Sequence, residues 1–120
     1  MLDIVLYQPE IPPNTGNIIR LCANTGSRLH IIRPIGFDIG EKAMRRAGMD
    51  YLKKVDIHVY HDLDDFIENN KFKRLFLVTK FAEKLYNEYL YKIGDYFMFG
   101  SESSGFTDEI FKKFKNQKKI

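Results

Sequence analysis

Cysteine, histidine and long apolar runs are all scarce in this sequence, and each scarcity excludes a class of protein or site. The 120 residues hold one cysteine, Cys22, which excludes an internal disulfide framework and a cysteine-based zinc site. The three histidines, His30, His58 and His61, do not have the spacing of metal ligands. No secretory signal is recognisable, and no stretch approaches the roughly 20 apolar residues of a membrane span. We therefore expect a reduced, soluble, cytoplasmic protein with no membrane segment and no metal.

Basic residues gather in two clusters. Apolar residues make up 44% and charged residues 29% of the chain, which is typical of a single globular domain. The formal net charge is +3. The clusters lie in the middle and at the end of the chain and consist of Lys42, Arg45, Arg46, Lys53, Lys54, Lys112, Lys113, Lys115, Lys118 and Lys119. They fit an anionic partner such as RNA, but ordinary solvated lysines would give the same pattern.

Apolar stretches alternate with amphipathic ones along the chain. The pattern predicts strands over residues 2–7, 28–33, 56–60, 74–79 and 95–99, and helices over about 14–25, 40–46, 63–69 and 107–114. Residues 82–91 are ambiguous, and residues 115–120 resemble a loop that enters another strand. The alternation predicts an α/β fold with a mostly parallel sheet and helices on both faces. Ligands of such sheets bind beyond the carboxyl ends of the strands, where residues 8–17 and 100–105 lie.

The predicted helix over residues 14–25 has an apolar and a polar side. The apolar side, which we expect to pack on the sheet, holds Ile18, Ile19, Cys22 and Ala23. The opposite side holds Asn14, Asn17, Arg20 and Asn24. Residues 14–16 are N-cap candidates, Gly26 is the C-terminal stop, and the helix N-terminus adds affinity for a phosphate. A polar binding site and an ordinary solvent-facing side both explain the stripe.

A glycine-bounded loop follows the most apolar predicted strand. Gly100 and Gly105 enclose serines, and glycine lets a backbone come close to a ligand. Their spacing matches neither the Walker P-loop nor the dinucleotide fingerprint. The pattern fits both a nucleoside-binding loop and a tight loop that needs glycine for its turns. The acids nearest this predicted cleft, Glu10, Glu102 and Asp108, do not indicate a hydrolase.

A third segment, over residues 45–51, combines two arginines with a tyrosine. Arg45 and Arg46 can clamp a phosphate, and Tyr51 can stack on a base. The same residues also fit the last turn of a helix, where cations complement the helix dipole.

Taken in order, these segments resemble one family. The matching stretches are residues 2–7, 9–12, 14–26, 45–48, 50–51, 94–96 and 98–100, followed by Glu102. In them the chain is similar to the small single-domain tRNA 2′-O-methyltransferases of the SPOUT superfamily, which modify the wobble nucleotide. The resemblance covers residues 1–120 as one domain. It implies a parallel-sheet α/β fold with a trefoil knot near the C-terminus, and a homodimer.

The resemblance also implies an activity and a set of site residues. The implied reaction moves a methyl group from S-adenosylmethionine to the ribose 2′-hydroxyl of cytidine or uridine at position 34, in the tRNA anticodon loop. Arg20 matches the arginine at the reacting hydroxyl. Because a guanidinium stays protonated, we expect it to position the oxygen and stabilise negative charge. The implied cofactor contacts are Val78, Gly100 and Glu102, and the implied substrate contacts are Asn14, Asn17, Arg45, Arg46 and Tyr51.

The family pattern continues past the end of this sequence. An Ile-Pro-Met strand, a Ser-Leu-Asn-Leu-Ser loop and a C-terminal helix, which thread the knot and complete the cofactor site, are not among these 120 residues, and Ser104 stands where relatives often have arginine. We therefore expect a C-terminally incomplete domain, which by itself binds S-adenosylmethionine weakly or not at all and does not methylate tRNA. A non-catalytic RNA- or nucleoside-binding module and an inactive fragment are the alternatives.

Overall fold

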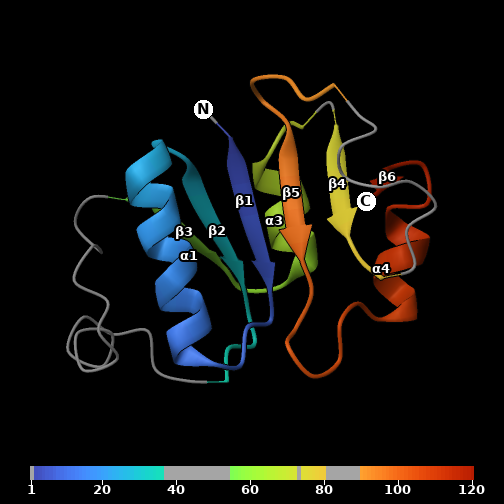
Figure 1. The fold of residues 1–120 in the computed structure, drawn as a ribbon. Coiled ribbons are helices and arrows are strands. Elements are labelled where there is room, and N and C mark those ends of the chain that lie inside the picture. Colours follow the sequence, from blue (N-terminus) through green and yellow to red (C-terminus); the bar gives the residue numbers. More distant parts are fainter. Residues whose placement is uncertain (1, 37–54, 73, 81–89) are drawn as a thin grey trace.

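A six-stranded parallel sheet forms the centre of the molecule (Figure 1). The computed structural model describes residues 2–36, 55–72, 74–80 and 90–120. Within these ranges the elements are β1 (Asp3–Tyr7), α1 (Pro12–Thr25), β2 (Arg28–Ile32), β3 (Ile57–Tyr60), α3 (Leu63–Asn69), β4 (Leu75–Val78), β5 (Tyr96–Phe99), α4 (Asp108–Lys113) and β6 (Lys118–Lys119). The strand order is β3-β2-β1-β5-β4-β6, and every neighbouring pair is parallel.

The direction of winding changes between β1 and β5. From β1 the chain moves outward to β2 and β3, and it then crosses to the other half of the sheet, where β5 lies between β4 and β1. Parallel sheets bind ligands in the crevice at such a switch point, beyond the carboxyl ends of the strands. These ends form the lower edge of the sheet in Figure 1.

Helices cover both faces of the sheet, and each face has its own apolar core. On one face α1 buries Ile19 and Cys22, and burial raises the pKa of the Cys22 thiol to about 11. On the other face α3 and α4 bury Leu63, Phe66 and Ile110. These helices therefore hold the strands from both sides, which leaves the edge at the carboxyl ends for loops.

The five predicted strands and their parallel pairing are confirmed, and each observed strand lies within its predicted range. α3 spans the predicted residues 63–69, and α4 lies within the predicted 107–114 with Thr107 as its N-cap. The residues expected to enter another strand form β6, which pairs with β4. The helix predicted over residues 40–46 and the ambiguous residues 82–89 lie outside the described part of the chain.

The start of α1 differs from the prediction. The helix begins at Pro12, with Ile11 as an N-cap whose side chain makes no capping bond, rather than within residues 14–16. Pro12 and Pro13 suit this place because the φ of proline is already helical, and its missing N–H would have no partner in the first turn. The C-terminal stop is confirmed, because Gly26 adopts a left-handed φ of 71°.

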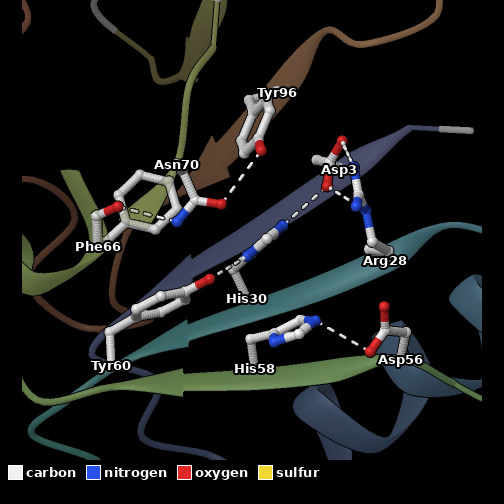
Figure 2. A network of polar contacts seen from close by, with 9 residues as sticks. All are labelled: Asp3, Arg28, His30, Asp56, His58, Tyr60, Phe66, Asn70 and Tyr96. Carbon is white, nitrogen blue, oxygen red and sulfur yellow. Dashed lines mark hydrogen bonds and ion pairs between the residues drawn. The ribbon is translucent and has the colours of Figure 1, made fainter. Parts of the chain in front are cut away.

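A polar network lies on the α3 side of the sheet, with Asp3 and His30 buried and Arg28 partly exposed (Figure 2). His30 Nε2 lies 2.8 Å from Asp3 Oδ1, and His30 Nδ1 lies 2.8 Å from Tyr60 Oη. Arg28 Nε donates to the same carboxylate oxygen at 2.9 Å. Burial lowers the pKa of His30, and the bond to Asp3 opposes this effect. Arg28, His30 and Tyr60 of this network also line a separate pocket of about 610 Å³.

Within the described ranges, none of the helices is long and apolar enough to cross a membrane. Among the same residues, no group of three or more His, Cys, Asp or Glu side chains is arranged to hold a metal ion.

Candidate functional site

Two adjoining pockets open at the carboxyl edge of the sheet. The β4–β5 pocket, of about 410 Å³, is lined by Val78, Thr79, Lys80, Phe99 and residues 100–106. The α1 pocket, of about 360 Å³, is lined by Leu6, Asn14, Thr15, Asn17, Ile18, Phe99, Gly100 and Glu102. Since Phe99, Gly100 and Glu102 line both, the two pockets share a wall at the end of β5.

The loop over residues 100–105 closes on itself at its base. Ser101 N–H donates to the Gly105 carbonyl at 3.2 Å, and Gly105 N–H donates to the Ser101 carbonyl at 2.8 Å. A Cβ on Gly100 would lie 2.6 Å from the Gly105 carbonyl carbon, closer than real Cβ contacts come. Gly105 has a φ of 64°, in the region that favours glycine. The tight-loop interpretation is therefore confirmed, and the same loop lines the β4–β5 pocket.

The Glu102 carboxylate lies at the beginning of α1. The N–H groups of Glu10 and Ile11 both donate to Glu102 Oε2, each at 2.6 Å. Pro12 and Pro13 have no N–H to offer. A carboxylate of the protein itself therefore accepts from the two N–H groups that precede this helix, and the phosphate affinity of its N-terminus stays a prediction. The negative charge of Glu102 also complements the helix dipole.

Glu10 makes the reciprocal contact with the loop. Its Oε1 accepts from Ser103 N–H at 3.2 Å, from Ser103 Oγ at 2.7 Å, and from the Ser101 hydroxyl. The Ser101 hydroxyl has one proton, for which Glu10 Oε1 and the Gln8 carbonyl oxygen, 2.9 Å away, compete as acceptors. The serine hydrogen bonds hold the pKa of the Glu10 carboxyl below its ordinary value. Each glutamate thus binds the segment that carries the other.

The polar side of α1 is divided between the α1 pocket and solvent. Asn14 and Asn17 line the pocket, as expected of substrate contacts. Arg20 follows one turn later on the exposed side of the helix and lines neither pocket, and Asn24 is exposed beyond it. Arg20, the predicted catalytic residue, is therefore not part of the lining of the α1 pocket.

The remaining predicted site residues fall into two groups. Val78, Gly100 and Glu102 all line the β4–β5 pocket, so the structure brings the three expected cofactor contacts together. The expected substrate contacts Arg45, Arg46 and Tyr51 lie outside the described residues.

Two residues at this edge were not assigned a role in the site from the sequence. Thr15 is 1% exposed and lines the α1 pocket, and its hydroxyl has no hydrogen-bond partner among the described residues. From the sequence Thr15 was only an N-cap candidate, and the helix begins before it. Glu10 was recognisable as an acid near the cleft. Its contacts with Ser101 and Ser103, however, span 91 and 93 positions of the chain, which no local pattern encodes.

The β4–β5 pocket fits a nucleoside-bearing cofactor. Its volume of about 410 Å³ lies in the range of about 300–1,000 Å³ that is usual for small-molecule pockets. Val78, Phe99 and Phe106 supply apolar surface for an adenine ring. Residues 100–105 of the glycine-serine loop line the same pocket.

Comparison with known proteins connects this geometry to one family. The model of the SpoU rRNA Methylase family matches residues 1–120. A protein of Escherichia coli K12 named tRNA (cytidine(34)-2′-O)-methyltransferase is 49% identical over 120 residues, which cover 100% of this chain and 76% of that protein. A protein of the same name from Photorhabdus asymbiotica is 47% identical, with 100% of this chain and 77% of that protein covered.

Solved structures agree in fold. A structure described as giving insight into the 2-OH methylation of C/U34 on tRNA has a TM-score of 0.88 and 37% identity, and the match covers 99% of this chain and 77% of that one. An AdoMet-bound rRNA methyltransferase from Sinorhizobium meliloti has a TM-score of 0.82 at 20% identity, with 99% and 46% covered, and it supports the fold alone. The family model matches residues 1–120, and the solved structure covers 99% of this chain. This chain therefore belongs to the SpoU rRNA Methylase family, within the SPOUT methyltransferases.

Proposed function

We propose that this protein transfers a methyl group from S-adenosylmethionine to the ribose 2′-hydroxyl of nucleotide 34 in tRNA, with cytidine or uridine as the base. The O–C bond would form as the S–C bond breaks, so that S-adenosylhomocysteine leaves and the hydroxyl proton passes to solvent. The names of the protein's relatives support the substrate. The observation that carries the proposal is the wall shared by the two pockets. A methyl donor in one pocket and a ribose in the other would meet at Gly100 and Glu102, at the topological switch point of the sheet.

The β4–β5 pocket is the proposed donor site. Val78 and Gly100 would contact the cofactor, and the carbonyl groups of the glycine-serine loop suit a positively charged sulfonium. When bound, S-adenosylmethionine supplies an electrophilic methyl carbon. Glu102 places a negative charge on the shared wall, where it favours that cation, while the N–H groups of residues 10 and 11 hold its Oε2.

The α1 pocket is the proposed acceptor site. Asn14 and Asn17 would hydrogen-bond the ribose and so orient the 2′-hydroxyl, since displacement in line requires the reacting atoms about 3–3.5 Å apart and aligned. Arg20, one turn along α1, would position the oxygen and stabilise the negative charge that develops on it. Arg45, Arg46 and Tyr51 stay predicted substrate contacts.

The RNA chain would also contact basic residues outside the pockets. Lys112, Lys115 and Lys118 are exposed at the C-terminal end of α4 and in the segment that follows. Such lysines bind phosphates irrespective of sequence. A homodimer, as in the family, is part of the same proposal, and light scattering coupled to size exclusion tests it.

A transfer assay with tritiated S-adenosylmethionine and unmodified tRNA tests the function. It compares the 120-residue chain with the same chain extended by the C-terminal segment of its longer Escherichia coli relative. Transfer by the extended chain supports the proposal, and its absence from the shorter chain supports the expectation drawn from the sequence. If tRNA binds but neither form transfers a methyl group, the non-catalytic RNA-binding alternative replaces this proposal.

A further inference from the structure

We propose that Glu10 is a positioning residue, which holds the 100–105 loop in the shape that forms the wall between the two pockets. Glu10 lines neither the β4–β5 pocket nor the α1 pocket, so it would act on the reaction through the loop. The inference rests on the proposed function, because that wall matters for catalysis only if donor and acceptor meet across it.

The loop fixes its own base but not its tip. The mutual backbone bonds of Ser101 and Gly105 close the base. Residues 102–104 are exposed, and within the described part of the chain their hydrogen bonds run mainly to the β1–α1 segment. The orientation of the tip therefore depends on contacts from outside the loop.

Glu10 provides those contacts with a single carboxylate. It accepts the N–H and hydroxyl of Ser103 at the tip and the hydroxyl of Ser101, which is 8% exposed, at the base. One side chain thus fixes the tip relative to the base. Hydrogen bonds to a charged acceptor are stronger than neutral ones.

A close backbone approach fixes Glu10 in turn. Gly36 N–H donates to the Pro9 carbonyl at 2.9 Å, and a Cβ on Gly36 would lie 3.1 Å from Glu10 Cα. The segment after β2 therefore supports the segment after β1, which supports the loop after β5. Three loops from neighbouring strands stabilise the shared wall.

Glu10 and Glu102 have different places in this arrangement. Glu102 lines both pockets, so its replacement would change a pocket wall directly. Replacement of Glu10 weakens the support of the loop without changing the identity of any residue that lines the two pockets. Replacement of Glu10 therefore tests the support of the loop more directly than replacement of Glu102 does.

Hydrogen exchange followed by mass spectrometry tests the support itself on the 120-residue chain. In Glu10→Ala we expect peptides covering residues 100–106 to exchange about fivefold faster, as expected for the loss of a net hydrogen-bond contribution. Glu10→Gln, which keeps an acceptor oxygen, should lie between Glu10→Ala and the unmodified chain. Glu68→Gln, at an exposed glutamate on α3, is the matched control and should leave the loop unchanged. Unchanged loop exchange in Glu10→Ala would overturn the proposal.

Cofactor affinity, measured by calorimetry on whichever form is active in the transfer assay, tests the consequence. We expect the Kd for S-adenosylmethionine to rise in the order unmodified, Glu10→Gln, Glu10→Ala, with the melting temperature nearly constant. Ser103→Ala should add less than its own effect on top of Glu10→Ala, because the two changes remove one contact. Faster loop exchange with unaltered affinity would contradict the positioning role. If no form is active, the proposed function fails, and the exchange measurement alone decides whether Glu10 holds the loop.

Discussion

Charged side chains of both signs surround the site, where Glu102 and Lys80 line the β4–β5 pocket. Glu10 and Glu102 tie the loop after β5 to the segment before α1, and Arg20 lies further along the exposed side of that helix. The Glu102 carboxylate therefore lies on the shared wall, and Arg20 lies about one helical turn after Asn17, which lines the α1 pocket. This order suits a cationic donor and an acceptor oxygen that gains negative charge.

Replacement of Arg20 tests the acceptor half of this arrangement. In a form active in the transfer assay, Arg20→Ala should lower kcat by about 100-fold or more, which is the usual effect of removing one donor to a developing oxyanion. Arg20→Lys should also fail, because an ammonium cannot reproduce the guanidinium fork. Asn24→Ala, on the same side of α1, is the control and should retain activity.

The affinity for S-adenosylmethionine separates two roles for Arg20. Because Arg20 does not line the β4–β5 pocket, its replacement should leave the Kd measured by calorimetry nearly unchanged. A lost affinity would make Arg20 a cofactor contact or a structural residue and would contradict the proposed role.

His30 predicts a pH dependence of stability. Burial lowers its pKa in the folded state, despite the bond to Asp3, whereas an unfolded histidine titrates near pH 6.5. Below about pH 6.5 the unfolded chain therefore binds a proton that the folded chain does not, so stability falls with falling pH. This group can account for at most about 1.4 kcal/mol between pH 7.5 and 5.5.

Urea unfolding at the two pH values checks this expectation. His30→Gln should be less stable at pH 7.5, since it disturbs the bonds to Asp3 and Tyr60, and its stability should change less between the two pH values. His61→Gln, at an exposed position, should keep the full change. An identical pH dependence in His30→Gln would exclude His30 as its source.

At the scale of elements, α1 and the strands differ in how far the sequence predicts them. The strands were predictable because uninterrupted apolar runs such as residues 96–99 suit strands buried on both faces. The polar stripe of α1 was predictable from helical periodicity. Its starting residue was not, because Pro12 and Pro13 begin the helix while a carboxylate 91 positions away accepts the N–H of Ile11.

The loop after β5 depends on one close approach. In Gly100→Ala the added Cβ would lie 2.6 Å from the Gly105 carbonyl carbon, and that carbon belongs to the backbone, so the loop must open. We expect a loss of about 1–3 kcal/mol in the free energy of unfolding, as for other overpacked sites, together with weaker binding of S-adenosylmethionine.

Gly26→Ala is the matched control for Gly100→Ala. Gly26 has a φ of 71° and no atom within 4 Å of a Cβ, so alanine there strains the backbone far from the pockets. It should lower the urea midpoint while the cofactor Kd stays constant. Equal losses of affinity in the two variants would mean that general destabilisation, and not the loop, controls binding.

At the scale of the whole molecule, the parallel sheet places the site at the edge formed by the carboxyl ends of its strands. The topology brings the ends of β1, β4 and β5 together, although their residues are distant in sequence. The sequence predicted which loops lie at this edge, because each follows an apolar strand. It could not predict which residues touch there, since contacts such as Glu10 with Ser103 depend on strand order.

The C-terminal basic residues predict part of the affinity for RNA. Lys112 and Lys115 are exposed, and each phosphate contact adds close to one unit to the salt dependence of binding. Lys112→Ala combined with Lys115→Ala should weaken tRNA binding and reduce the slope of log K against log salt by up to about 2. Lys71→Ala, at another exposed lysine, should leave the slope unchanged. The same slope in all three proteins would exclude these lysines from the interface.

The central claim is that the two pockets bring a methyl donor to the 2′-hydroxyl of nucleotide 34. Its most direct test is mass spectrometry of the nucleosides and the anticodon-loop fragment of tRNA after incubation with S-adenosylmethionine and the C-terminally extended chain. The account predicts one methyl group on the ribose of nucleotide 34, formed at least about 100-fold more slowly when Arg20→Ala is used. A methyl group on the base, or at another position of the tRNA, would contradict it.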